Sequence, residues 1–218
     1  MYEAQRRSIV EAAHLLIERR ALSLSLHGNI SIRVPGTEHI VMTGSSLAAL
    51  NEESLAVISL SGEIVWGSLA PAEREVAGMH TAFYSARPLA GALVHAHSPY
   101  ATAFAVASRP IPIVAESLAR WGFSVDVPVA GWAPRGSAAS ISNIADALTS
   151  NPQSSAVLLE NHGVLVSGDD PESSARVLIS LEENSQLAVL AAALGGSRVL
   201  GAEETAAARD RRHEFGTN

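Results

Sequence analysis

Residues 91–99 read GALVHAHSP, an apolar run that carries two histidines two positions apart and ends at a serine–proline pair. The apolar run predicts a buried strand, and Ser98-Pro99 predicts a helix that begins directly after it. Side chains two positions apart on a strand point to the same face, so we expect His95 and His97 to lie together. Two such imidazoles can chelate one divalent ion, although this spacing alone also arises by chance.

A third histidine, His162, strengthens the metal interpretation. It stands in the segment ENHG at residues 160–163, after an apolar strand and before a glycine that permits a sharp turn. Three histidines in a chain without cysteine fit zinc, or a similar metal, with one coordination position left open. The alternative interpretation is that all three are polar residues at strand ends with ordinary hydrogen-bond partners.

Other histidine-metal folds fit this sequence poorly. A cupin would place a glutamate shortly after the histidine pair, but residues 98–108 contain none. An amidohydrolase barrel would be longer, with its histidine pair on an early strand, and the sequence has no helical His-Glu-x-x-His motif. We interpret the remaining histidines as surface or core residues: His14, His27, His39, His80 and His213.

The composition describes a globular protein with a restricted chemistry. The 218 residues are 47% apolar and 17% charged, and we expect a single domain over residues 1–218. The chain has no cysteine and no lysine. Disulfides, cysteine nucleophiles and Schiff-base catalysis on lysine are therefore excluded. The net charge of −7 argues against a nucleic-acid partner.

No targeting or membrane segment stands out. Residues 1–20 are charged throughout and lack the apolar region of a signal peptide. The richest apolar stretch, residues 187–194, is far shorter than the roughly 20 residues of a membrane helix. The sequence therefore predicts a cytoplasmic protein without a membrane partner.

Hydrophobic periodicity predicts interspersed helices and strands. Helices are expected at 3–20, 71–86, 99–108, 137–149 and 171–194. Strands are expected at 30–34, 39–42, 56–60, 63–66, 91–97, 156–160 and 163–167. Ser61-Gly62 is typical of a hairpin, so we expect a mixed or antiparallel sheet covered by helices. Residues 201–218 are polar and are interpreted as a flexible tail or frayed helix.

Two glycine-containing corners gather backbone amides and hydroxyls. They are GNIS at residues 28–31 and TGSS at residues 43–46. Such corners can form an anion-binding nest, and ordinary turns use the same residues.

Taken in order, these motifs resemble the class II aldolase/adducin family, the group of fuculose-phosphate aldolase and ribulose-phosphate 4-epimerase. The resemblance runs from about residue 5 to residue 195. It implies a three-layer α/β/α fold with a mainly antiparallel central sheet, and a homotetramer with active sites between subunits. It also implies that His95, His97 and His162 bind a divalent metal. Zinc is the expected ion, and Mn²⁺, Co²⁺ or Fe²⁺ could use the same ligands.

The family also carries an acid–base carboxylate at the start of the helix that precedes the strand with the histidine pair. Glu75, five residues before His80, is the favoured candidate, and Glu73 is the other. A plain role at a helix start is the structural alternative for either residue. The anionic end of the substrate is expected to bind at Asn29, Thr43, Gly44 and Ser45.

The implied chemistry is lyase chemistry on a small anionic substrate. A cation on three histidines can grip a carbonyl and an adjacent hydroxyl and stabilise an enediolate while the carboxylate moves a proton. Cleavage of a carbon–carbon bond in a sugar-phosphate-like substrate is the leading prediction. Decarboxylation of a hydroxy, keto or aromatic acid, 4-epimerisation, and a non-catalytic adducin-like scaffold are the alternatives.

Two departures from the family pattern favour decarboxylation as the main competitor. Sugar-phosphate aldolases of the family have a serine pair before the catalytic glutamate, where this chain has Ala70-Pro71-Ala72, or Glu73-Arg74 if Glu75 is the base. They also supply a tyrosine from the segment after the histidine pair, where this chain has Glu116. Glu116 is either another acid–base group or an exposed helix residue. In some members the tail covers the active site, a role open to Arg211, Arg212 and His213.

Overall fold

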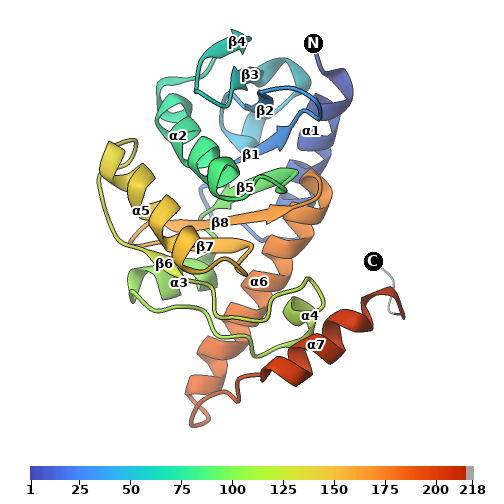
Figure 1. Ribbon diagram of the computed structural model, residues 1–218, viewed down its shortest axis with the longest axis vertical. Coiled ribbons are helices and arrows are strands. Elements are labelled where there is room, and N and C mark those ends of the chain that lie inside the picture. The colour runs from blue at the N-terminus through green and yellow to red at the C-terminus, as the bar shows by residue number, and fades with distance from the viewer. Residues whose placement is uncertain (215–218) are drawn as a thin grey trace.

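The computed structural model describes residues 1–214, and an eight-stranded sheet forms its middle layer (Figure 1). The strands are β1 (Gly28–Arg33), β2 (His39–Thr43), β3 (Leu55–Ser59), β4 (Ile64–Trp66), β5 (Ala92–Ala96), β6 (Val129–Ala130), β7 (Ala156–Leu159) and β8 (Gly163–Gly168). The α-helices are α1 (Glu3–Glu18), α2 (Pro71–Ala86), α3 (Pro99–Val106), α4 (Glu116–Ala119), α5 (Ala138–Ser150), α6 (Pro171–Ala192) and α7 (Ala202–Asp210). Short 3-10 turns occupy Leu47–Ala49, Glu52–Ser54 and Arg212–Glu214.

The strand order is β4-β3-β2-β1-β5-β8-β7-β6, and every neighbouring pair is antiparallel except β6 with β7. Helices α2 and α5 cover one face of the sheet, while α1, α3 and α6 cover the other (Figure 1). This arrangement confirms the predicted three-layer α/β/α class with a mainly antiparallel sheet. Because the sheet has a helix layer on each side, most residues of its central strands β1 and β5 are buried on both faces.

Strand β5 lies at the centre of the sheet, and all five of its residues are buried. It pairs with β1 on one side and β8 on the other, so its register fixes the position of His95 relative to both strands. His95 stands opposite Asn29 of β1 and Leu165 of β8. The alternation of the strand places Val94 in the core beneath α1 and α6, and places His95 on the side of α2.

Capping residues explain where the main helices begin. Pro71, Pro99 and Pro171 each occupy the first turn of their helices, where a missing N–H costs nothing. Asp170 accepts a hydrogen bond from the Ser173 backbone N–H, and Ser137 accepts one from Ser140. These starts agree with the predicted boundaries to within one residue.

The structure corrects the expectation for the C-terminal segment. We expected a flexible tail or frayed helix over residues 201–218, but α7 is a formed helix that packs on α4 and buries Thr205 and Ala208. Small side chains carry this packing, so hydropathy periodicity gives no signal for it. Strand β6 escaped prediction, because two residues are too short for a periodic pattern. Helix α4 was anticipated only as the helix of the structural alternative for Glu116. Residues 215–218 of the expected tail lie outside the described residues.

Within residues 1–214, no helix has both the length and the apolar character needed to cross a membrane.

Candidate metal centre

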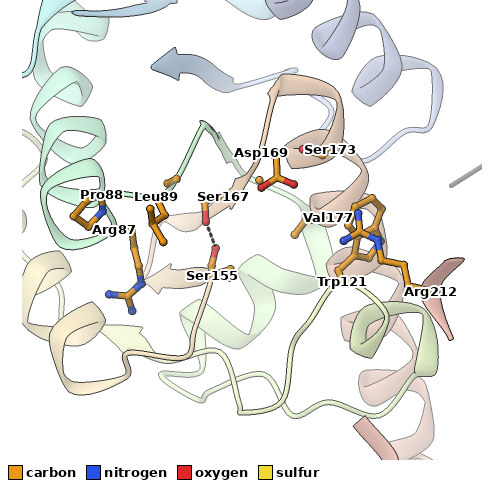
Figure 2. Close-up of a pocket in the computed structure, with 12 residues that line it drawn as sticks. Arg87, Pro88, Leu89, Trp121, Ser155, Ser167, Asp169, Ser173, Val177 and Arg212 are labelled. Carbon is orange, nitrogen blue, oxygen red and sulfur yellow. Dashed lines mark hydrogen bonds between the residues drawn. The ribbon is translucent and has the colours of Figure 1, made fainter. Parts of the chain in front are cut away.

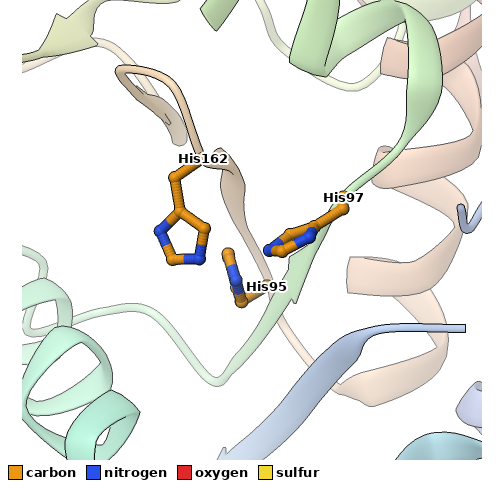
Figure 3. A group of neighbouring side chains, drawn as sticks. All are labelled: His95, His97 and His162. Atoms are coloured by element: carbon orange, nitrogen blue, oxygen red, sulfur yellow. The ribbon is translucent and has the colours of Figure 1, made fainter. Parts of the chain in front are cut away.

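Three histidines converge where strand β5 ends and strand β8 begins (Figure 3). His95 lies on β5, His97 follows the end of that strand, and His162 occupies the turn between β7 and β8. One ring nitrogen from each residue lies within 4.8 Å of the others. This is the grouping that the sequence predicted.

Within residues 1–214, hydrogen bonding leaves the Nε2 atoms of His95 and His97 free to bind a cation. His95 is fully buried, and its Nδ1 lies 3.1 Å from the carbonyl oxygen of Val164, so Nδ1 carries the proton. The Nε2 atoms of His95 and His97 are buried and have no hydrogen-bond partner among the described residues. Buried polar atoms normally have partners, so these two nitrogens fit metal ligands. The residues present therefore fit a divalent cation.

Electrostatics keep these imidazoles neutral, as metal ligation requires. Burial, followed by the nearby histidines, lowers the pKa of His95 well below its usual value. Burial is also the main cause that lowers the pKa of His97 to about 4 and that of His162 to about 4. At neutral pH all three present lone pairs instead of positive charges.

Gly163 makes room for the cluster. A Cβ atom on Gly163 would lie 2.5 Å from the Ala96 carbonyl oxygen and 2.9 Å from the His97 ring. It would also approach the His95 ring to 3.3 Å. Only glycine therefore fits beside the two imidazoles, which gives the last position of the ENHG segment a steric reason.

The two candidate carboxylates differ in their surroundings. Glu73 is 7% exposed, and its Oε2 is buried without a hydrogen-bond partner among the described residues. Burial raises the pKa of Glu73, and the charge of Arg135 partly opposes this rise. Glu75, the candidate we favoured from spacing, is half-exposed and forms an ion pair with Arg135 at 2.9 Å. Helical geometry turns the two side chains in different directions, which spacing to His80 did not resolve.

A buried chain of hydrogen bonds links helix α2 to Asn29 of strand β1. Ser31 Oγ lies 3.0 Å from the Tyr84 hydroxyl and 2.7 Å from His80 Nδ1, and His80 Nε2 lies 2.5 Å from Asn29 Oδ1. Burial lowers the pKa of His80 to about 4, so the ring is neutral and carries one proton. Nε2–H donates to Asn29, and Nδ1 accepts from Ser31. The Asn29 oxygen is thereby engaged, beside His95 on the next strand.

In the second glycine-containing corner, residues 43–46, two of the groups expected to bind an anion already have hydrogen-bond partners within the fold. The Gly44 N–H donates to the Ser54 carbonyl at 2.9 Å, and the Thr43 hydroxyl accepts from the Ile30 N–H at 3.3 Å. A Cβ on Gly44 would lie 2.6 Å from the Ser68 carbonyl oxygen, so close packing requires glycine there. Ser45 is half-buried next to them. The Gly44 amide is thus committed to the fold, while the anion-binding role of Asn29, Thr43 and Ser45 stays a prediction.

A pocket of about 340 Å³ opens beside the histidines. His27, His97, His162, Trp132 and Arg135 are among the residues that line it. The His27 ring lies 4.6 Å from the His97 ring, a position we did not foresee when we interpreted His27 as a surface or core residue. Arg135 stands in the loop before α5, and no periodic pattern marks such a loop residue as functional. We identified neither residue as functional from the sequence.

A second pocket, of about 310 Å³, lies at the other end of the same strands (Figure 2). It is lined by residues around the start of β5 and the end of β8, with Arg212 stacked 4.3 Å above the Trp121 ring. Arg212 therefore points away from the histidines of its own chain. Arg211 bonds Glu214 at 2.8 Å, and the side chain of His213 lies outside the described part of the structure.

Glu116 is also remote from the metal centre within one chain. It is exposed at the start of α4, where it forms an ion pair with Arg120 at 3.3 Å. Helix α4 packs with α6 and α7 on the opposite side of the sheet from α2.

Together, the three-layer fold and the histidine centre at the end of β5 define a class II aldolase-like protein. The family model of the class II aldolase and adducin N-terminal domain matches residues 7–189. The chain belongs to this family, which confirms the resemblance seen in its motifs.

Two curated relatives and one solved structure show the range of the similarity. L-fuculose phosphate aldolase of Methanococcus maripaludis is 30% identical over 183 residues, covering 83% of this chain and 93% of the relative. 3-oxo-tetronate 4-phosphate decarboxylase of Haemophilus influenzae is 32% identical over 191 residues, covering 84% and 86%. The structure of an L-fuculose 1-phosphate aldolase superposes with a TM-score of 0.85 at 26% identity, covering 99% of this chain and 98% of the other. The named relatives are lyases of two kinds.

Proposed function

We propose that this protein is a metal-dependent lyase that cleaves a carbon–carbon bond of a small anionic hydroxy-carbonyl substrate. The proposal rests on the ring nitrogens of His95 and His97, which are buried and have no hydrogen-bond partner within residues 1–214, and on His162, which completes the group. A divalent cation held there supplies Lewis acidity toward a carbonyl and its neighbouring hydroxyl. Zinc is the ion we expect for three imidazoles.

Glu73 is the acid–base residue in this proposal. A carboxylate that moves a proton at neutral pH needs a raised pKa and a free oxygen, and Glu73 has both. The charge of Arg135 acts on Glu73, and it also acts on His97 and His162. This shared neighbour supports a position of Glu73 beside the metal centre. Glu75 has a guanidinium partner instead of a free oxygen.

Asn29 orients the substrate in this proposal. Its Oδ1 accepts the hydrogen bond from His80, so the N–H₂ group of its amide is left to donate elsewhere. Because Asn29 stands opposite His95, such a donor suits an oxyanion of a substrate held at the metal centre. The residues around it are buried, so water has little access to this hydrogen bond.

Proton exchange tests the lyase proposal directly. Zinc-loaded protein is incubated with dihydroxyacetone phosphate in heavy water, and proton NMR follows the carbon-bound protons. We expect one proton signal to be lost with the metal present and retained after chelation. Glu73→Gln should slow the exchange at least 100-fold, whereas Glu75→Gln should retain measurable exchange. The opposite pattern for the two variants would assign the proton transfer to Glu75.

Decarboxylation is the second candidate. It is favoured by the decarboxylase relative and by the missing serine pair, since Ala70-Pro71-Ala72 offers no hydroxyls for a phosphate. Metal-dependent release of CO₂ from a hydroxy or keto acid, without exchange of dihydroxyacetone phosphate, would establish it. A protein that binds no stoichiometric metal would be an adducin-like scaffold instead.

A further inference from the structure

Arg135 presents a guanidinium to the pocket beside the metal centre. It lines this pocket together with His27, His97 and His162. Its Nε donates a hydrogen bond to Glu75 Oε2 at 2.9 Å. The other N–H groups of the guanidinium have no hydrogen-bond partner among residues 1–214. Most of the hydrogen-bonding capacity of Arg135 is therefore available inside a pocket that a substrate would enter.

The loop that carries Arg135 is built to hold it there. The Trp132 N–H donates to Glu160 Oε2 at 2.7 Å, and the Asn143 side chain donates to the Gly131 carbonyl at 2.9 Å. Ser137 then caps the first turn of α5. Both ends of the loop are thus fixed by hydrogen bonds to neighbouring elements, so the direction of Arg135 is set by the fold.

Gly136 brings the loop against helix α2. Its φ of +77° is a left-handed conformation that favours glycine. A Cβ atom at this position would lie 3.1 Å from the Glu75 Cβ and 3.3 Å from its Cγ. The close approach of the loop to helix α2 accompanies the ion pair between Glu75 and Arg135.

The Glu75–Arg135 pair is replaceable. The Glu75 side chain is 51% exposed and that of Arg135 is 34% exposed, and ion pairs in this setting contribute about 0–1 kcal/mol. A carboxylate on a ligand could therefore take the place of Glu75 at little cost. The guanidinium fork matches the two oxygens of a carboxylate, and its free N–H groups allow the two-point contact that Glu75 does not make.

We propose that Arg135 is a carboxylate-binding residue of the substrate pocket, and that Glu75 is its resident counter-ion until a substrate carboxylate replaces it. The inference rests on the proposed function for the position of the substrate, and it specifies the substrate class as a hydroxy-carbonyl compound that carries a carboxylate. A phosphate could also bind a guanidinium, and the test separates the two anions.

Isothermal titration calorimetry of the zinc-loaded protein tests the proposal with three small ligands. L-malate offers a hydroxy acid to the metal and a distal carboxylate to Arg135. The C4 amide of L-malate has the same shape without the distal charge, and 3-phosphoglycerate replaces the distal carboxylate with a phosphate. We expect malate to bind at least tenfold more tightly than the amide.

Variants of the protein test whether Arg135 causes the preference for malate over its amide. Arg135→Gln should weaken malate binding about tenfold and leave the Kd of the amide within twofold of the wild-type value. Glu75→Gln should tighten malate binding severalfold, because the competing carboxylate is removed. Arg7→Gln is the matched control, since Arg7 is also an exposed arginine paired with a glutamate, on helix α1. It should change neither Kd.

Several results would overturn the proposal. Equal binding of malate and its amide, or an equal loss of both in Arg135→Gln, would make Arg135 a structural residue of the loop. Tighter binding of 3-phosphoglycerate that depends on Arg135 would make this a phosphate subsite. Circular dichroism of each variant checks folding, and Arg135→Lys gives a second reading if Arg135→Gln is unfolded, since lysine keeps the charge but loses the fork. The exchange experiment tests the lyase proposal separately from the role of Arg135, because dihydroxyacetone phosphate carries no carboxylate.

Discussion

A single residue decides whether the histidine cluster forms, because a Cβ atom at Gly163 would leave too little room for the rings of His95 and His97. The turn that carries His162 begins with Asn161 at a φ of +56° and continues into glycine. The sequence predicted His95, His97 and His162 as metal ligands, while the contacts of Gly163 explain why a glycine follows His162.

Gly163→Ala should remove metal binding without removing a ligand. The added methyl group would collide with the Ala96 carbonyl oxygen and the His97 ring, so the rings must shift apart. We expect metal content, measured by plasma mass spectrometry after dialysis, to fall at least tenfold. Gly201→Ala is the control, because a Cβ there meets nothing closer than 3.6 Å. A fully loaded Gly163→Ala protein would contradict this account.

Ser31→Ala should destabilise the protein through the buried hydrogen-bond chain. The change leaves His80 Nδ1 and the Tyr84 hydroxyl without their shared partner in a fully buried place. Unpaired buried polar groups cost about 1–3 kcal/mol each, so we expect a loss of ~2 kcal/mol in the free energy of unfolding in urea. Ser142→Ala, on the exposed surface of α5, should cost less than 0.5 kcal/mol by the same measurement.

At the scale of elements, the helix that follows the histidine pair depends on a distant carboxylate. Helix α3 begins at Pro99, and the backbone N–H groups of Tyr100 and Ala101 donate to the two oxygens of Glu182, each at 2.8 Å. Helix α6 thus supplies the cap that α3 lacks locally, since Ser98 caps no N–H of its own helix and bonds the Ala21 carbonyl instead.

Glu182→Ala should therefore lower the free energy of unfolding more than Glu183→Ala does. Two N–H groups lose a charged acceptor at a helix start, and we expect a loss of ~2 kcal/mol in the free energy of unfolding. Glu183→Ala is the matched control, because Glu183 is the adjacent, exposed residue of the same helix. Equal stabilities of the two variants would show that the cap contributes nothing.

At the scale of the whole molecule, the histidines couple stability to pH. Burial lowers the pKa of His80, His97 and His162 to about 4 each, and lowers that of His95 and His27 in the same direction. Between about pH 4 and 6.5 the unfolded chain therefore binds more protons than the folded chain at these residues. The buried carboxyls of Glu73 and Glu182, whose pKa values are raised, oppose this with fewer groups.

The metal-free protein should consequently gain stability as the pH rises from 4.5 to 6.5 and level off above that value. The lowering of the His80 pKa from 6.5 to about 4 corresponds to ~3 kcal/mol in total, of which about 2 kcal/mol falls between pH 4.5 and 6.5. Urea unfolding at pH 5 and pH 7 in the presence of a chelator measures the effect. His80→Gln should reduce the slope, and a stability that is flat between the two values would refute the coupling.

The homotetramer implied by the family stays a prediction. Helix α6 exposes Leu187 and Leu190 near its end, and Leu194 is exposed just after it, so this apolar surface could be buried by association. Light scattering should give four times the 22.8 kDa of one chain. A monomeric mass would leave Glu116 without a route to any active site, because α4 lies on the far side of the sheet from the histidines of its own chain.

The sequence by itself determined the main helices and strands and a mixed or antiparallel sheet, because these follow from periodicity and turn residues. The order of its motifs carried the family resemblance, which implied the three-layer class and the three histidine ligands. The segment that forms β5 is the most informative, because side chains alternate between the two faces of a strand and His95 and His97 therefore point to the same face. Local patterns of this kind are set by backbone geometry that neighbours do not alter.

Only the tertiary structure decided which groups meet across the chain. It separated Glu73 from Glu75 and joined Asn29 to His80. It also brought Arg135 to the histidines from a loop that lies between His97 and His162 in the sequence. It also formed α7, whose packing rests on small side chains. These outcomes depend on how helices and loops pack against the sheet, and the burial and partners of a side chain arise only from that packing.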